Sequence, residues 1–133
     1  MYDVNELIDN AIQAREFAYT PYSNFKVGAA ILLKNGKYIL GCNVENASYG
    51  LCNCAERTAL FKMISEGYNK DDVKCMCIVG KTARPISPCG ACRQVMSELL
   101  LPNTPVILTN LDKEIKELKV IDLLPYSFSE EDL

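Results

Sequence analysis

An Asn35-Gly36 pair between two apolar stretches, 25–33 and 37–44, constrains the fold more than any other feature of the sequence. Asn-Gly between strand-like segments is the strongest short-range hairpin signal, and both positions of the expected tight turn need positive φ. The two stretches are therefore expected to pair as antiparallel strands.

Helical and strand-like segments alternate around this hairpin. Apolar residues recur at helical spacing from Val4 to Ile12, and this first helix should end before Thr20-Pro21. The later segments are, in order, a helix over 54–65, a strand over 73–79, a helix over 88–101, a strand over 105–111, a short helix over 120–124 and an acidic tail over 127–133. This order favours a mixed sheet covered by helices, and residues 1–133 are expected to form one domain.

The composition excludes several kinds of chemistry. Lys plus Arg number 14 against 17 Asp plus Glu, a net charge of -3, and no basic run is present, which disfavours nucleic acid as a partner. Histidine is absent, which excludes Ser-His and Cys-His catalytic pairs and imidazole metal ligands. No apolar stretch is long enough to cross a membrane, and 1–13 does not have the composition of a secretory signal. We therefore expect no membrane partner.

The seven cysteines are an odd number, so they cannot all form intrachain disulfides. We expect a cytoplasmic protein, in which thiols stay reduced unless they bind metal or react. Cys89 and Cys92 form a C-x-x-C motif after Pro88, at the start of an expected helix, where the positive helix end favours thiolates. Alone, this motif is ambiguous among a zinc site, a redox pair and coincidence.

Cys54 also opens an expected helix and is the third candidate ligand. Three thiolates around one zinc ion leave the fourth tetrahedral position for water, as in catalytic sites. A closed site with a fourth cysteine is the alternative. Cys42, Cys75 and Cys77 lie in strand-like segments and are expected in the core, whereas Cys52 is the remaining rival. Cys52 would crowd the metal beside Cys54, so we expect the open site, with one zinc per chain.

Glu56 follows Cys54 by two residues and can point beyond the helix end. There it could take a proton from water and return it, although a favourable charge in the first helical turn would also explain it. Zinc with three thiolates carries a net charge of about -1, so a positive group is expected nearby. Arg57 and Arg93 are the candidates, and we favour Arg57.

Five stretches of the sequence match the motifs of one protein family. They are 21–25 (PYSNF), 27–30 (VGAA), 41–47 (GCNVENA), 54–59 (CAERTA) and 87–94 (SPCGACRQ). Together they resemble the small, homotetrameric type of cytidine deaminase, and a C-x-E segment paired with P-C-x-x-C is the signature of zinc-dependent nucleobase deaminases. The resemblance implies a three-layer α/β/α fold with a central mixed sheet of about five strands.

The resemblance also implies an activity, namely the zinc-dependent hydrolysis of cytidine and deoxycytidine to uridine and deoxyuridine, with release of ammonia, in pyrimidine salvage. Cys54, Cys89 and Cys92 would hold zinc, and Glu56 would move the proton. Asn43 and Glu45 would bind the sugar hydroxyls, Phe25 would pack near the nucleoside, and Ala55 and Ser87 would contact the edge of the base.

Two further implications concern the oligomer. In the family, the aromatic residue that corresponds to Phe128 stacks on the base in a neighbouring subunit's site, and the tyrosine that corresponds to Tyr49 lies near the subunit junction. The alternative is that Phe128 covers the core of its own domain. Tyr126 and Ser127 depart from the smaller residues of many relatives.

Two other functions remain open at this point. One is deamination of another cytosine-containing nucleoside, such as a nucleoside antibiotic. The other is a non-catalytic zinc or redox module built on Cys89 and Cys92. Editing of nucleic acid is disfavoured by the acidic charge and by the lack of interleaved aromatic and basic residues.

Overall fold

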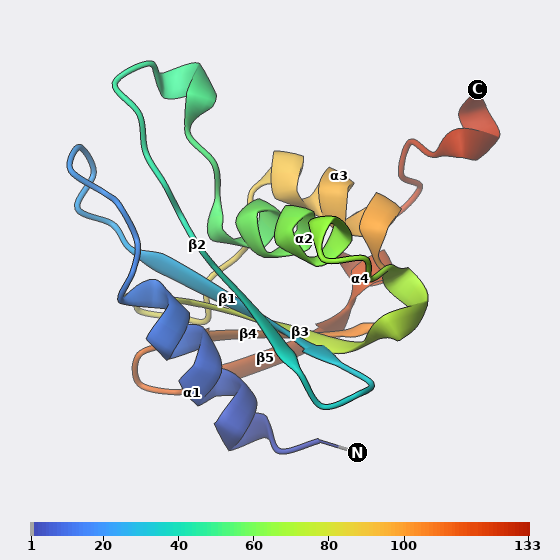
Figure 1. The fold of residues 1–133 in the computed structure, drawn as a ribbon, viewed down its shortest axis with the longest axis horizontal. Coiled ribbons are helices and arrows are strands. Elements are labelled where there is room, and N and C mark those ends of the chain that lie inside the picture. Colours follow the sequence, from blue (N-terminus) through green and yellow to red (C-terminus); the bar gives the residue numbers. More distant parts are fainter. Residues whose placement is uncertain (1) are drawn as a thin grey trace.

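A computed structural model describes residues 2–133 and shows a sheet between two layers of helices (Figure 1). The strands are β1 (Val27–Leu33), β2 (Tyr38–Cys42), β3 (Val73–Gly80), β4 (Pro105–Asn110) and β5 (Ile115–Lys119). The helices are α1 (Val4–Arg15), α2 (Ala55–Ser65), α3 (Gly90–Leu99) and α4 (Val120–Leu123). The expected α/β/α architecture is confirmed. Among the described residues, no helix has the length and apolar character that crossing a bilayer requires.

The direction of the strands brings two helix N-termini together. The strand order is β2-β1-β3-β4-β5, with β1 antiparallel to both of its neighbours and β3 parallel to β4. Strands β2 and β3 therefore run in the same direction and end at the same edge of the sheet. Helix α2 follows β2 and helix α3 follows β3, so both helices begin near this edge. In open sheets with parallel strands, ligands bind at the carboxyl ends of the strands.

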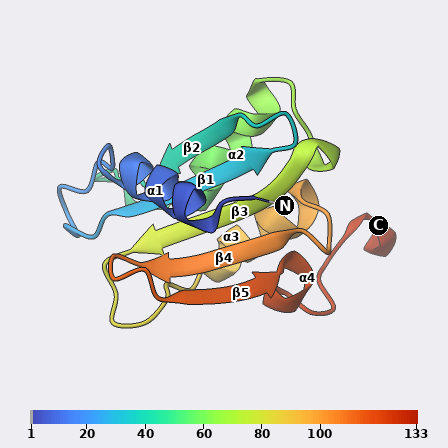
Figure 2. The same ribbon diagram turned by 90° about the horizontal axis from the view of Figure 1, so that it is seen from below.

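The core lies on both faces of the sheet. Helix α1 covers one face, and α2 and α3 cover the other (Figure 2). On the first face, Leu7, Ile8 and Ala11 of α1 pack against buried residues of β1, β3 and β4. On the second face, Leu60 and Met63 of α2 and Met96 of α3 form part of the larger core. Because both faces are covered, β1 is buried along its whole length.

The turn between β1 and β2 differs from the expected tight turn. The Leu33 N–H donates to the Lys37 carbonyl at 2.9 Å, so residues 34–36 form a three-residue loop. Gly36 has a φ of 90°, whereas Asn35 is not among the residues with positive φ. A three-residue hairpin loop needs the left-handed conformation only at its last residue. The hairpin itself is present, and the expectation for Asn35 was wrong.

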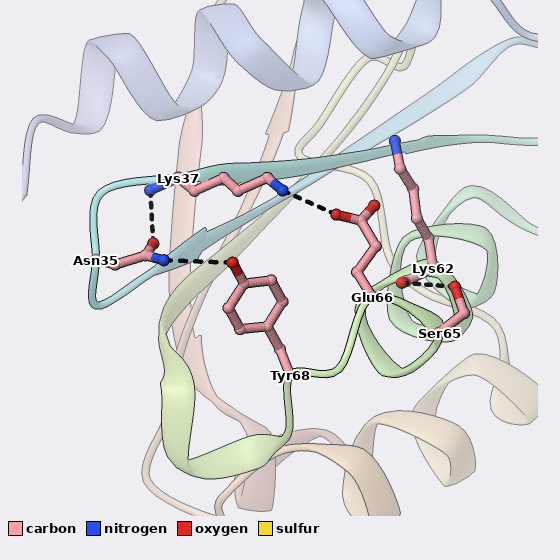
Figure 3. A network of polar contacts seen from close by, with 6 residues as sticks. All are labelled: Asn35, Lys37, Lys62, Ser65, Glu66 and Tyr68. Carbon is pink, nitrogen blue, oxygen red and sulfur yellow. Dashed lines mark hydrogen bonds and ion pairs between the residues drawn. The ribbon is translucent and has the colours of Figure 1, made fainter.

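Polar contacts join this turn to the C-terminal end of α2 (Figure 3). Lys37 Nζ lies 2.9 Å from Glu66 Oε1, and Asn35 Nδ2 donates to the Tyr68 hydroxyl at 3.4 Å. Lys37 Nζ also lies 5.7 Å from the centre of the Tyr68 ring. Exposed ion pairs contribute little to stability individually, so this network chiefly defines where the end of α2 sits on the hairpin.

The strand β5 and several element boundaries were not anticipated from the sequence. Three of the five residues of β5 are charged and the strand is mostly exposed, because β5 is an edge strand. Strand β1 begins at Val27 rather than residue 25, and α3 spans Gly90–Leu99 rather than 88–101. Cys54 and Cys89 are N-cap residues, outside the helices that they precede.

A close contact under α2 generates a prediction about stability. A Cβ atom on Gly41 of β2 would lie 2.5 Å from Ala59 N and 2.6 Å from Ala55 O, both backbone atoms of α2. Gly41→Ala should therefore displace α2 and lower the free energy of unfolding by about 1–3 kcal/mol, measured by urea denaturation. Gly50→Ala is the matched control, because its Cβ would meet nothing within 4 Å. Equal stability of both variants would contradict the close packing of α2 on β2.

Candidate active site and metal centre

Three cysteine thiols meet where α2 and α3 begin. Cys54 is the N-cap of α2, Cys89 is the N-cap of α3, and Cys92 lies in the first turn of α3. Their Sγ atoms all lie within 4.8 Å of one another, and Cys54 Sγ is 3.9 Å from Cys89 Sγ. Sulfurs around a tetrahedral zinc with Zn–S bonds of about 2.3 Å lie about 3.8 Å apart. The three side chains therefore fit a zinc ion.

The other cysteines lie elsewhere. The Asn46 N–H donates to Cys52 Sγ at 3.3 Å, and within residues 2–133 no fourth Cys, His, Asp or Glu belongs to the thiol cluster. Cys75 and Cys77 are buried under α1, where burial raises the pKa of both thiols to about 12. Burial also raises the pKa of Cys42 in β2. A three-thiolate site leaves one zinc coordination position open.

Hydrogen bonds within the cluster set the protonation of the thiols. They lower the pKa of Cys54 to about 5, mainly through the Cys92 thiol and also through Arg57 and Cys89. The same contact with Cys54, together with burial, raises the pKa of Cys92. The lowered pKa of Cys54 favours its thiolate, which is the form of cysteine that binds metal.

Arg57 and Arg93 have different partners. Arg57 Nη2 lies 3.4 Å from Cys54 Sγ, and this hydrogen bond raises the pKa of Arg57, which keeps the guanidinium charged. The buried Arg57 Nε has no hydrogen-bond partner among the described residues. Arg93 donates instead to Pro88 O, Leu123 O and Ser87 Oγ. Of the two candidates, Arg57 is therefore the one placed to offset thiolate charge.

Glu56 is buried in the first turn of α2, with 4 % of its surface exposed. Burial is the main cause of its raised pKa, and the neighbouring Cys54 raises that pKa further. A carboxyl group with a raised pKa can both accept and donate a proton near neutral pH, which suits acid/base catalysis. A carboxylate that served only the helix dipole would gain nothing from this burial, so the position favours a chemical role.

A cavity of about 200 Å³ opens beside the thiols and Glu56. Its lining consists of Phe25, Val27, Asn43, Cys54, Ala55, Glu56, Ile86, Ser87 and Cys89. The fold thus brings Phe25, Asn43, Ala55 and Ser87, which were selected from the sequence, to the same cavity as the thiols. Val27 and Ile86 were missed.

Ile86 reaches the cavity because Gly80, at the end of β3, has no side chain. A Cβ atom on Gly80 would lie 2.6 Å from Ile86 Cδ1 and 3.4 Å from Phe25 Cζ. In the sequence, Ile86 is a single apolar residue between Pro85 and Ser87, and no periodicity marks it. The only available signal was its position three residues before Cys89.

Asn43 holds the backbone that carries Phe25. Its Oδ1 accepts from the Val27 N–H at 2.8 Å, and its Nδ2 donates to the Phe25 carbonyl at 2.8 Å. One amide hydrogen and one oxygen lone pair remain for a ligand. The side chain can therefore position the cavity wall and still contact a bound molecule.

Glu45 and Tyr49 line a second hollow of about 200 Å³, together with Tyr22, Ser23 and Cys52. Glu45 Oε1 accepts from the Tyr22 and Ser23 N–H groups at 3.0 and 3.1 Å, and Glu45 Oε2 accepts from the Ser23 hydroxyl. The hydrogen bond from the Ser23 side chain is the main cause of the lowered pKa of Glu45. The side chain is thus an oriented carboxylate with remaining capacity for hydroxyl donors.

Phe128 does not line either hollow. It lies in the C-terminal tail, 60 % exposed, and its carbonyl accepts from Gln94 Nε2 at 3.0 Å. In both ribbon views this tail extends away from the body of the molecule (Figures 1 and 2). The single chain therefore brings the expected contacts Phe25, Asn43, Ala55 and Ser87 to the cavity of the thiols and Glu56. Glu45 and Tyr49 line the other hollow, and Phe128 lines neither.

Comparisons with known proteins agree with this geometry. Residues 1–108 match the family model described as the cytidine and deoxycytidylate deaminase zinc-binding region. A cytidine deaminase from Halalkalibacterium halodurans is 58% identical over 131 residues, which cover 98% of each chain. One from Sporosarcina psychrophila is 51% identical over 131 residues, covering 98% of this chain and 95% of the relative.

Solved structures give the same result. A cytidine deaminase from Burkholderia pseudomallei superposes with a TM-score of 0.93 at 54% identity, covering 96% of this chain and all of the other. The enzyme from Mycobacterium tuberculosis gives 0.82 at 37% identity, covering 97% and 99%. The match to a deaminase zinc-binding region, together with the three-cysteine cluster, places the chain in the class of zinc-dependent deaminases. Within that class, the chain belongs to the cytidine and deoxycytidylate deaminase family.

Proposed function

We propose that this protein deaminates cytidine and deoxycytidine by hydrolysis, yielding uridine, deoxyuridine and ammonia for pyrimidine salvage. The main structural support is the cluster of Cys54, Cys89 and Cys92, which lies beside the buried Glu56 at one cavity. Relatives with 58% and 51% identity are named cytidine deaminases, which supports the choice of substrate. When bound by the three thiolates, zinc supplies the Lewis acidity that makes water nucleophilic at neutral pH.

Glu56 carries the proton transfers of the proposed reaction. Its carboxylate accepts a proton from water as the water oxygen adds to C4 of the cytosine ring, and it delivers this proton to N3. When the C4–N bond breaks, Glu56 passes a second proton from the added oxygen to the amino group, which leaves as ammonia. Burial of Glu56 limits access of competing water and raises its pKa, which favours the protonated form that donates in the second half of each transfer.

Residues of the cavity, together with Glu45 of the second hollow, would bind and orient the nucleoside. Ala55 and Ser87 would contact the edge of the base, and Phe25 would pack against the nucleoside. Asn43 and Glu45 would accept hydrogen bonds from the sugar hydroxyls. Because Glu45 is an oriented carboxylate with a lowered pKa, a phosphate on the sugar would be repelled. A free nucleoside is therefore favoured over a nucleotide or a nucleic acid.

We also propose a homotetramer in which neighbouring chains complete each site. Phe25 and Cys89, which line the cavity, are exposed in the single chain, whereas the reaction needs water excluded from the reacting centre, so further walls are needed. Tyr49 and Phe128 are exposed aromatic residues, 76 % and 60 % accessible, that a second chain could use. The need to keep three thiols reduced supports a cytoplasmic location.

Replacing the proton carrier tests the proposed reaction. Glu56→Gln keeps the size of the side chain but removes its basicity, so the rate of ammonia release from cytidine should fall by about 10²-fold or more. Metal analysis of the same variant should still find one zinc per chain, because the thiols are unchanged. Near-normal turnover would leave Glu56 with a structural role only.

Cytidine monophosphate, assayed with the unmodified protein, tests the proposed contact between Glu45 and the sugar. Turnover of the monophosphate should be much lower than that of cytidine, because in the proposed binding mode the Glu45 carboxylate would repel a phosphate on the sugar. Equal turnover of the two compounds would contradict the proposed position of Glu45 but not the role of Glu56, so the two parts of the proposal fail separately.

Mixing two inactive variants tests the shared site. Glu56→Gln lacks the proton carrier, and a chain truncated before Tyr126 keeps Glu56 but lacks Phe128. After dissociation and reassociation, mixed oligomers should recover activity that neither variant has alone. Native mass spectrometry confirms that mixed oligomers form. Mixed oligomers without activity, or an active monomer in light scattering of the unmodified protein, would contradict shared sites.

A further inference from the structure

Arg93 follows Cys92 directly, yet its guanidinium contacts backbone and hydroxyl oxygens rather than sulfur. All three of its nitrogens have a different acceptor. Nε donates to Pro88 O at 2.8 Å, Nη1 donates to Leu123 O at 2.9 Å, and Nη2 donates to Ser87 Oγ. The side chain is half-buried, so these hydrogen bonds are partly shielded from solvent.

Two of these contacts hold the loop that enters α3. Pro88 is buried and immediately precedes Cys89, so the position of the Pro88 carbonyl constrains the position of the Cys89 backbone. Ser87 lines the cavity beside the thiols. From its position in α3, Arg93 therefore holds the cavity residue Ser87 and the backbone that leads into Cys89.

The third contact holds the other end of the chain. Leu123 is the last residue of α4, and the tail that carries Phe128 begins just beyond it. The neighbouring Gln94 donates from Nε2 to the Phe128 carbonyl at 3.0 Å. The first two turns of α3 thus hold the metal-ligand loop on one side and the C-terminal tail on the other.

We propose that Arg93 is a positioning residue that couples the Ser87-Pro88 loop, and with it Cys89, to the C-terminal tail. This inference rests on the proposed function for its biological meaning, because the loop and the tail belong to the proposed deaminase site. Its physical content, the placement of a ligand loop and a tail by one guanidinium, does not depend on the substrate.

Lysine cannot replace arginine in this role. A guanidinium presents its donors in a rigid planar fork, whereas an ammonium is a compact point charge on a flexible stem. Arg93→Lys keeps the charge but cannot serve three acceptors that belong to two different segments. The Arg93→Lys variant therefore distinguishes the geometry of the guanidinium from its charge. If only the charge mattered, Arg93→Lys would behave like the unmodified protein.

The test measures zinc release and tail cleavage in the zinc-loaded protein. Release of zinc to a chromogenic chelator should be roughly 10-fold faster or more in Arg93→Gln and Arg93→Lys, the size of effect expected for residues that orient metal ligands. Chymotrypsin cleavage after Tyr126 and Phe128, followed by mass spectrometry, should also accelerate. Cytidine turnover per bound zinc should show a raised KM with a smaller change in kcat.

Arg84→Gln is the matched control. Arg84 lies in the same loop, is exposed, and its side chain makes no hydrogen bond or ion pair within residues 2–133. A second arm combines Ser87→Ala with Arg93→Gln, where Ser87→Ala should accelerate zinc release alone but add nothing further in the double variant.

Several results would overturn the proposal. They are wild-type zinc release and tail cleavage in Arg93→Lys, equal acceleration in Arg84→Gln, or fully additive effects of Ser87→Ala and Arg93→Gln. If Arg93→Gln does not fold, Arg93→Lys and Ser87→Ala decide the outcome. Zinc release and tail cleavage need no substrate, so these two measurements test the role of Arg93 even if the protein does not turn over cytidine.

Discussion

The site depends on one constraint, the convergence of two helix N-termini at the same edge of the sheet. Strand β1 lies between β2 and β3 and is antiparallel to both, so β2 and β3 run in the same direction. The helices that follow them, α2 and α3, therefore begin at the same edge of the sheet. N-cap positions then place Cys54 and Cys89 opposite each other, with sulfurs 3.9 Å apart. Helix N-termini stabilise negative charge, which suits thiolate ligands.

Charge compensation explains the residues around the thiols. In a chain without histidine, the three clustered cysteines supply the soft ligands, and their combined charge would exceed that of one zinc ion by about one unit. Arg57 contacts Cys54 and supplies a fixed positive charge, whereas Arg93 is occupied with backbone oxygens. Glu56 stays buried beside this balanced cluster, where its raised pKa suits proton transfer.

The sequence predicted what local patterns determine. Helical periodicity, the hairpin and the C-x-E and P-C-x-x-C motifs were sufficient for the helices, four strands and the architecture. β5 was missed because a charged edge strand needs no apolar alternation, and Asn35 was misjudged because loop length, which selects the turn type, depends on how the strands pair. Ile86 was missed because its place at the cavity depends on a tertiary contact, in which its side chain occupies the space left by the missing side chain of Gly80. Phe128 lines neither hollow of the single chain, so its contact with a base in a neighbouring chain's site stays a prediction.

The reaction proposed for this protein requires an open zinc site with three sulfur ligands. Zinc K-edge X-ray absorption of the purified protein tests it directly. We expect three sulfur scatterers at about 2.3 Å and one oxygen or nitrogen scatterer at about 2.0 Å. Four sulfur scatterers would close the site and require Cys52 or another thiol to enter it. That result, or a shell without sulfur, would contradict the account.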